Sequence, residues 1–162
     1  MFFLKLIVCG TLFSLSVYSS AAELPGTVIG VADGDSITLL DTSNAQHKIR
    51  LSGIDAPERY QPFSDVSKRS LSDLVYNRTV TVHYNKTDRY RRIIGRIEVD
   101  GIDVNLEQIH RGLAWHYKQY MKEQPIDERL IYIKAEEAAR EKRIGLWSEN
   151  APVAPWEWRR AK

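Results

Sequence analysis

The chain has 162 residues, of which 43% are hydrophobic and 27% are charged. This composition indicates a globular domain with a core of its own and excludes an intrinsically disordered chain. The formal net charge is only +2 at pH 7, so overall charge does not indicate a polyanion as partner, and any such argument must rest on local clusters.

Residues 1–22 have the pattern of a secretory signal peptide. Lys5 is the only charged residue before Glu23, and it precedes the apolar run LIVCGTLFSLSV and the small residues SSAA. This pattern predicts export to the periplasm or the medium after cleavage behind Ala22; a membrane anchor is the alternative, although the run is short for a span. Cleavage would also remove the single cysteine, Cys9, so the mature domain is expected to have neither a disulfide nor a cysteine zinc site.

Alternating apolar and polar residues, bounded by turn residues, predict five short strands. Arg50 lies on the polar face of the third strand, which Pro57 ends. The predicted strands are two within 27–41, on either side of the turn DGD at 33–35, and one each at 46–54, 79–85 and 91–99.

Helical periodicity of apolar residues predicts three helices. Ser64 or Asp65 is the expected N-cap of the first, and Ile131, Ala135 and Ala138 form the apolar stripe of the third. The predicted helices are 64–77, a short one within 100–112, and 126–144.

The order of these elements predicts an α+β fold, namely a five-stranded antiparallel barrel of the oligonucleotide/oligosaccharide-binding (OB) type with about three helices packed outside it. The expected organisation is a signal peptide at 1–22, one domain at 23–148 and a tail at 149–162. The tail contains prolines and is predicted to be irregular. Its tryptophans are expected to pack on the domain; the alternative is that Arg159, Arg160 and Lys162 bind a polyanion.

Charged residues gather at the strand ends and turns. Asp35 and Asp55 offer the carboxylate oxygens that hard divalent cations prefer. Arg50 and Arg92 offer guanidinium groups that match the charge developing on a phosphodiester under attack. Glu58 could take a proton from an attacking water. Taken singly, these residues also suit a hairpin turn, a solvated strand or a surface ion pair. Only their order and spacing along the chain, taken together, favour an active site.

From about Thr27 to Ser148 the chain resembles the staphylococcal nuclease (thermonuclease) family. The matching motifs, in order, are VADGDSITL, IRLSGIDAPE, TDRYRRIIGRI, DGIDVN, RGLAW and AREKRIGLWS. The resemblance implies the OB-like barrel with helices and a calcium-dependent hydrolysis of DNA and RNA that has low sequence preference and leaves 3′-phosphate ends. It implies no stable protein partner, a monomer, and no contact with the membrane after signal cleavage.

The resemblance also implies roles for individual residues. Tyr120 is carried over as a substrate-binding tyrosine, although the register there also allows Tyr117. The implied set comprises the calcium ligands Asp35, Asp55 and Ala56 (through its carbonyl), the catalytic residues Arg50, Glu58 and Arg92, and the substrate-binding Tyr90 and Tyr120.

One position departs from the family pattern. Arg91 stands where the family usually has a glycine, which can adopt a positive φ that arginine resists. Either the loop changes conformation, in which case Arg91 could replace Arg92 as the acting group, or Arg91 is tolerated there.

Two other functions fit parts of the sequence. A catalytically inactive module of the same fold that binds nucleic acid or protein should lack at least one residue of the catalytic set, and none is missing. A glycosidase built on the Asp and Glu pairs would leave the arginines unexplained. The four histidines have no metal-ligand spacing, and Trp115 and Trp147 are expected in the core.

Overall fold

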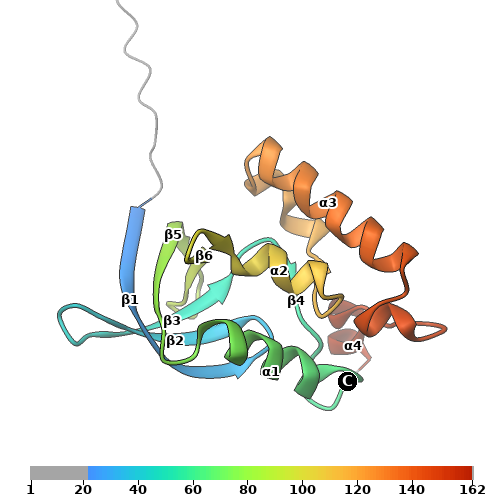
Figure 1. The fold of residues 1–162 in the computed structure, drawn as a ribbon, viewed down its shortest axis with the longest axis horizontal. Coiled ribbons are helices and arrows are strands. Elements are labelled where there is room, and N and C mark those ends of the chain that lie inside the picture. The colour runs from blue at the N-terminus through green and yellow to red at the C-terminus, as the bar shows by residue number, and fades with distance from the viewer. Residues whose placement is uncertain (1–21, 162) are drawn as a thin grey trace, which may run out of the picture.

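The structure of the protein is a computed structural model that describes residues 22–161. The signal peptide predicted at 1–22 lies outside these residues except for Ala22, and it stays a prediction. Figure 1 shows strands wound into a barrel, with helices beside it. The barrel strands are β1 (Ala22–Asp33), β2 (Ser36–Asp41), β3 (Gln46–Leu51), β5 (Thr79–Thr87) and β6 (Ile93–Val99).

β3 and β6 close the barrel as a parallel pair, with Ile49 opposite Ile93 and Arg50 opposite Ile94. The other neighbours, in the order β3-β2-β1-β5-β6, are antiparallel. The predicted α+β barrel is therefore confirmed, but the expectation that all its strands are antiparallel is wrong. Strand direction cannot alternate around a ring with an odd number of strands, so one neighbouring pair must be parallel.

Three of the helices match the predicted ones, and the fourth, α4, lies in the tail. The helices are α1 (Ser64–Val75), α2 (Val104–His110), α3 (Ile126–Glu141) and α4 (Pro155–Arg160), with short 3₁₀ helices at η1 (Lys118–Glu123) and η2 (Gly145–Ser148). Short strands lie at β4 (Ile54–Asp55), β7 (Ile102–Asp103) and β8 (Trp115–His116).

A single large core joins the barrel to the first three helices. Inward-facing residues alternate along the strands with half-buried or exposed ones, as in β6, where every second side chain is buried. Buried residues from all three of these helices enter the same cluster, among them Leu71 of α1, Ile109 of α2 and Tyr132 of α3. This burial holds the barrel and its strand ends in place.

The start of α1 differs from the expected N-cap. The helix begins at Ser64, but its N-cap is Phe63, which has a φ of 67° and makes no side-chain capping hydrogen bond. Asp65 instead lies in the first turn, where its charge favours the helix dipole. The prediction of a Ser64 or Asp65 cap is therefore wrong.

The buried face of α3 is also not the predicted stripe. Ala135 is buried as expected, but Ile131 is 50% exposed and Glu136 only 1% exposed. The Glu136 carboxylate pairs with Lys118 Nζ at 2.9 Å and accepts the backbone N–H of His116 at 3.2 Å. A buried charge that is paired and hydrogen-bonded can replace an apolar residue, which apolar periodicity does not reveal.

The tail is irregular at 149–154, as predicted, but then forms the helix α4. Pro155 stands at the start of α4, where its missing N–H and fixed φ are tolerated. Trp156 contacts the ring of Trp115 edge-on at a centroid distance of 5.5 Å, and Trp115 contacts Trp147 at 4.4 Å. The predictions that the tail packs a tryptophan on the domain and that Trp115 and Trp147 are core residues are confirmed.

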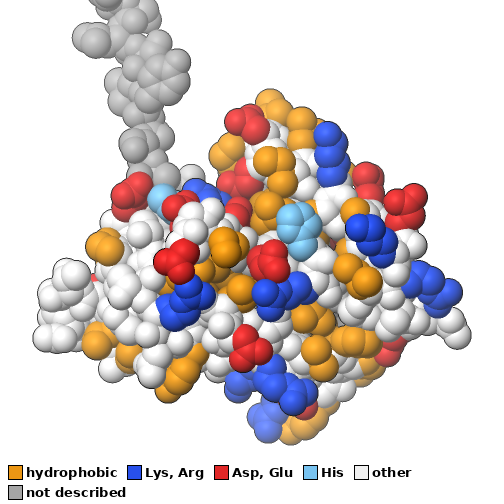
Figure 2. All heavy atoms as spheres, viewed as in Figure 1, with side chains coloured by type: hydrophobic (Ala, Val, Ile, Leu, Met, Phe, Trp, Pro, Cys, Tyr) orange, Lys and Arg blue, Asp and Glu red, His pale blue; other side chains and the backbone are white. Residues whose placement is uncertain are grey.

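The surface carries both signs of charge. On the face shown in Figure 2, acidic and basic side chains are interspersed, which agrees with the small net charge of +2. Among residues 22–161, no helix is long and apolar enough to cross a membrane.

Deleting residues 152–162 tests how much the tail contributes to stability. We expect the melting temperature to fall by at least about 5 °C, because the deletion removes two half-buried tryptophans, Trp156 and Trp158, and the buried Ala154 and Pro155. Thermal unfolding followed by circular dichroism measures this. Deleting only residues 161–162 is the control, and an equal melting temperature for both proteins would contradict the expectation.

Candidate functional site

The candidate site begins at the tight turn between β1 and β2. The Asp33 carboxylate accepts the backbone N–H of Asp35 at 3.1 Å, which closes the turn. Gly34 is required there, because a Cβ would lie 1.9 Å from Ser67 Oγ on α1. The turn is thus pressed against α1, and the side chain of Asp35 is left 5% exposed.

Arg50 joins two carboxylates that are distant in the sequence. Its Nη1 lies 3.0 Å from Asp35 Oδ2, and its Nη2 lies 2.7 Å from Asp55 Oδ1. The same guanidinium donates to the carbonyls of Leu51 and Ile54, at 3.0 and 3.1 Å. Arg50 therefore fixes both the turn after β3 and the spacing of the two aspartates, which the structure brings together as predicted.

The two aspartates are unusually buried for charged groups. Asp55 is 1% exposed and Asp35 5% exposed. Burial raises the pKa of Asp35 to about 8; Arg50 opposes this shift, while Asp33 and Asp55 add to it. The backbone N–H of Ala56 donates to Asp35 Oδ2 at 2.6 Å. Burial therefore makes the charged form of Asp35 unfavourable unless positive charge lies beside it.

Glu58 lies at the rim of this site and has a partner that the sequence analysis missed. Its side chain is 36% exposed, and its Oε1 lies 2.5 Å from Nη1 of Arg159 in α4. Arg159 also binds Asp55, with Nη2 at 2.8 Å from Oδ2. The pair spans 101 residues of sequence, so no local pattern could reveal it.

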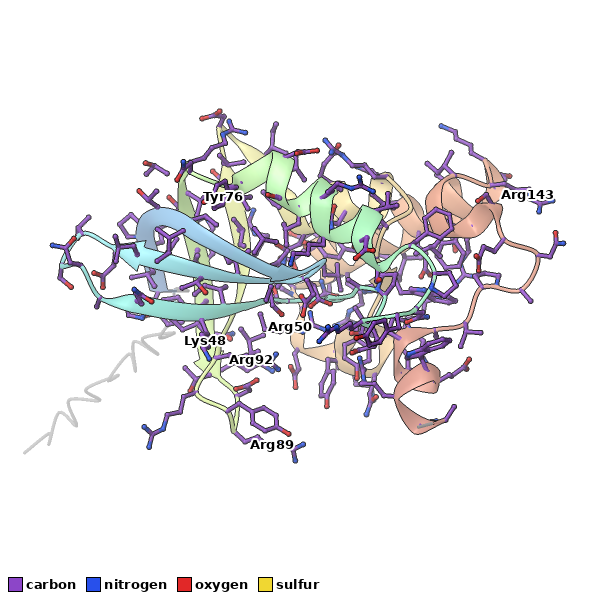
Figure 3. The ribbon with its side chains drawn as sticks, turned by 90° about the horizontal axis from the view of Figure 1, so that it is seen from below. Lys48, Arg50, Tyr76, Arg89, Arg92 and Arg143 are labelled. Atoms are coloured by element: carbon purple, nitrogen blue, oxygen red, sulfur yellow. The ribbon has the colours of Figure 1, made fainter. Side chains whose placement is uncertain are left out.

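Arg92 does not join this cluster directly. It directly precedes β6, two residues before Ile94, the partner of Arg50 in the parallel pair. Figure 3 shows Arg50 and Arg92 labelled near the base of the loop that carries Arg89. The Nε of Arg92 is bound to Asp88 Oδ2 at 2.8 Å within that loop.

The question raised by Arg91 is answered by the loop itself. Arg91 has a φ of 63°, the conformation that glycine would take, so the loop keeps its shape. Asp88 Oδ1 compensates by accepting the backbone N–H groups of Tyr90 and Arg92, at 2.8 and 2.9 Å. Arg91 is therefore accommodated in the conformation expected of a glycine, and Arg92 stays the candidate arginine.

Three tyrosines are candidates for contact with the substrate. Tyr90 is 63% exposed and Tyr120 is 46% exposed, so both offer ring surface for stacking. Tyr117 lies closer to the charged cluster, since burial together with Asp55 raises its pKa. It contacts Tyr120 at a centroid distance of 5.0 Å and stacks on Trp156 at 5.5 Å. The two rings contact each other, so the choice between Tyr117 and Tyr120 as the substrate-binding tyrosine stays a prediction.

A cleft of about 440 Å³ opens beside the carboxylates. Its lining includes Asp33, Asp35, Ala56, Glu58 and Lys68. The cleft therefore opens to solvent beside the buried Asp35, on the side on which Glu58 lies.

The donor set fits a hard divalent cation such as calcium. Arg50 holds Asp35 and Asp55 close to each other, and the carbonyl of Ala56 adjoins them in the chain. Calcium takes 6–8 oxygen ligands, and water can supply the remainder. Within residues 22–161, no group of three or more His, Cys, Asp or Glu side chains forms a metal cluster, so the protein would provide few of the ligands itself.

Comparison with known proteins agrees with this geometry. A family model described as "Staphylococcal nuclease homologue" matches residues 48–149. The chain therefore belongs to the staphylococcal nuclease family and is a hydrolase acting on phosphodiester bonds.

Similar proteins are known from several bacteria. An "Uncharacterized endonuclease" of Haemophilus influenzae is 39% identical over 158 residues, covering 96% of this chain and 85% of the relative. An "Uncharacterized endonuclease" of Escherichia coli is 41% identical over 152 residues, covering 93% and 95%. A "Micrococcal nuclease" of Shigella flexneri is 34% identical over 149 residues, covering 86% and 83%.

The buried Asp35 makes stability depend on pH. The unfolded state releases this proton near pH 3.8, whereas the folded state keeps it until about pH 8. Between these values the folded state binds more protons, so this contribution to the free energy of unfolding falls as pH rises, by at most about 1.4 kcal/mol per pH unit.

We expect Asp35→Asn to lack this pH-dependent contribution to the free energy of unfolding. Urea unfolding in EDTA between pH 5 and 9 measures it, with the exposed Asp73→Asn as control. Parallel pH profiles for wild type and Asp35→Asn would contradict the expectation.

Proposed function

We propose that this protein is an exported, calcium-dependent nuclease that hydrolyses DNA and RNA with low sequence preference and leaves 3′-phosphate ends. The observation that carries the proposal is the buried Asp35–Arg50–Asp55 cluster, with Glu58 beside it at the edge of an open cleft. It accounts for a metal, a phosphate clamp and a base within one site.

The metal would be held by Asp35, Asp55 and the carbonyl of Ala56, and when bound it would supply positive charge to the phosphate oxygens. Arg50 is held at the same place by two carboxylates and two carbonyls, so its fork is preorganised beside the phosphate position. Arg92, anchored by Asp88, would approach from the β5–β6 loop and stabilise the same charge.

Glu58 is the proposed general base. It would take the proton of the water that attacks phosphorus, while the bond from phosphorus to the 5′-oxygen breaks and that oxygen leaves with its electron pair. Its partial exposure, against the burial of both aspartates, leaves it accessible to water.

Low sequence preference follows from the kind of contacts available. Arginines contact phosphate groups and exposed tyrosines stack on any base, and neither reads the edges of the bases. The signal peptide predicted at 1–22 favours action in the periplasm or outside the cell on free nucleic acid, and we propose that the protein acts there as a monomer without a protein partner.

Calcium dependence is tested with purified mature protein, plasmid DNA and labelled RNA. We expect cleavage in calcium, loss of cleavage in excess EDTA, recovery when calcium is restored, and 3′-phosphate termini by end-group analysis. Undiminished cleavage in excess chelator would rule out the metal role, and 5′-phosphate termini would rule out the proposed direction of bond breakage.

The role of Glu58 is tested with Glu58→Gln. We expect kcat to fall by about 10²-fold or more, because the amide cannot accept the proton, while DNA binding persists. The control is Glu137→Gln on the exposed face of α3. Binding of DNA without cleavage by the wild-type protein would instead support the inactive binding module.

A further inference from the structure

Arg159 is the one member of the charged cluster that comes from the tail. It lies in α4, beyond residue 149, where the match to the family model ends. Its Nη1 lies 2.5 Å from Glu58 Oε1 and 3.2 Å from Asp55 Oδ1, and its Nη2 lies 2.8 Å from Asp55 Oδ2. One planar guanidinium thus joins the proposed base to a proposed metal ligand.

The contact is more than a surface ion pair. Isolated exposed pairs contribute little, but Asp55 is 1% exposed and both of its oxygens accept from guanidinium groups. Arg159 binds it in the two-pronged geometry that fixes orientation as well as charge. The contact therefore sets where Glu58 lies relative to Asp55.

Glu58 needs such a partner, because it follows Pro57 in a segment outside regular strands and helices and its side chain is partly exposed. A glutamate in this position would otherwise sample several rotamers. The chain also restrains it from the backbone side, since Gln61 Oε1 accepts the N–H of Glu58 at 2.9 Å.

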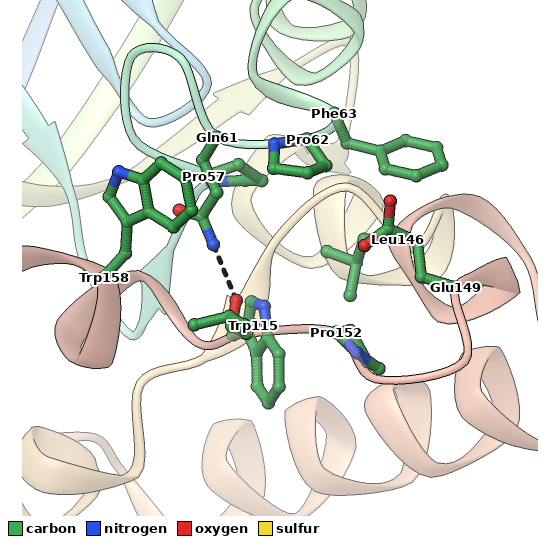
Figure 4. A pocket seen from close by; sticks show the side chains of 10 residues that line it. Pro57, Gln61, Pro62, Phe63, Trp115, Leu146, Glu149, Pro152 and Trp158 are labelled. Atoms are coloured by element: carbon green, nitrogen blue, oxygen red, sulfur yellow. Dashed lines mark hydrogen bonds between the residues drawn. The ribbon is translucent and has the colours of Figure 1, made fainter. Parts of the chain in front are cut away.

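The same Gln61 ties this segment to the tail. Its Nε2 donates to the carbonyl of Val153 at 2.6 Å, as Figure 4 shows from close by. Gln61 is 6% exposed, so its amide is a buried bridge between the Glu58 segment and the approach to α4. Trp156 anchors the helix itself by stacking on Tyr117 with an interplanar angle of 12°.

We propose that Arg159 is a positioning residue of the nuclease reaction: α4 docks so that this guanidinium holds the Glu58 carboxylate in a fixed orientation beside Asp55. This inference rests on the proposed function, in which Glu58 is the base. It assigns to the tail a part in the reaction rather than a merely structural one.

Replacing Arg159 is expected to lower kcat and to raise the affinity for the cation, and the two effects can be measured separately. Loss of the guanidinium frees the Glu58 side chain, which lowers kcat. It also removes a positive charge from Asp55, which strengthens the attraction of Asp55 for a divalent cation. A variant that simply damages the fold would lose both activity and cation binding.

The test compares Arg159→Gln, Arg159→Lys and the control Arg160→Gln in the mature protein. For Arg159→Gln we expect kcat on DNA at saturating calcium to fall by about tenfold or more with KM changed by less than about threefold. We expect the calcium Kd from calorimetry to fall by about threefold or more. Arg159→Lys should have an intermediate kcat, because an ammonium lacks the fork that reaches both carboxylates, and Arg160→Gln should match the wild type.

A double-mutant cycle shows whether Arg159 acts through Glu58. In the Glu58→Gln background, adding Arg159→Gln should change kcat by less than about twofold. An additive loss in the double mutant would overturn the proposal, and so would a single variant with wild-type kcat. Both of these outcomes would leave the proposed function standing, provided that the wild type cleaves and Glu58→Gln is strongly impaired. If Glu58→Gln cleaves normally, the base assignment fails and the proposal fails with it.

Discussion

The whole site depends on one buried guanidinium. Arg50 leaves the polar face of β3 and ends between Asp35 and Asp55, two carboxylates that would repel each other without it. Because it also binds the carbonyls of Leu51 and Ile54, the backbone turn and the charged cluster are stabilised by the same side chain. Removing it would leave buried Asp35 without its guanidinium partner and buried Asp55 with Arg159 alone, which is far more unfavourable than losing an exposed ion pair.

The closed barrel makes this arrangement possible. The turn that carries Asp35 and the strand that carries Arg50 are neighbours in the antiparallel ladder, where Ser36 lies opposite Arg50. The parallel pair between β3 and β6 then brings the base of the arginine-rich loop to the same end of the barrel. A closed ring of strands holds these segments rigidly, which suits a reaction that depends on positioned charge.

The tail adds a second layer to the site. α4 supplies Arg159 to Asp55 and Glu58, while Trp156 and the Gln61–Val153 hydrogen bond hold the helix against the domain. The match to the family model ends before this helix, at residue 149. The proposed active site is therefore larger than the motifs from which it was first identified.

The barrel and three of the four helices in residues 22–161 could be predicted from the sequence, because alternation, turn residues and helical periodicity are local signals. The grouping of Asp35, Arg50 and Asp55 followed instead from the order of the motifs and the resemblance to the nuclease family. Tertiary structure alone decided the parallel closure, the inward turn of Glu136, the left-handed Arg91 and the pairing of Arg159 with Glu58. The parallel closure, the burial of Glu136 beside Lys118 and the Arg159 pair depend on which distant segment lies opposite. The conformation of Arg91 depends on Asp88 in its own loop, whose side chain accepts two backbone N–H groups. Contacts between residues 101 positions apart leave no periodic trace in the chain, so only the folded molecule reveals them.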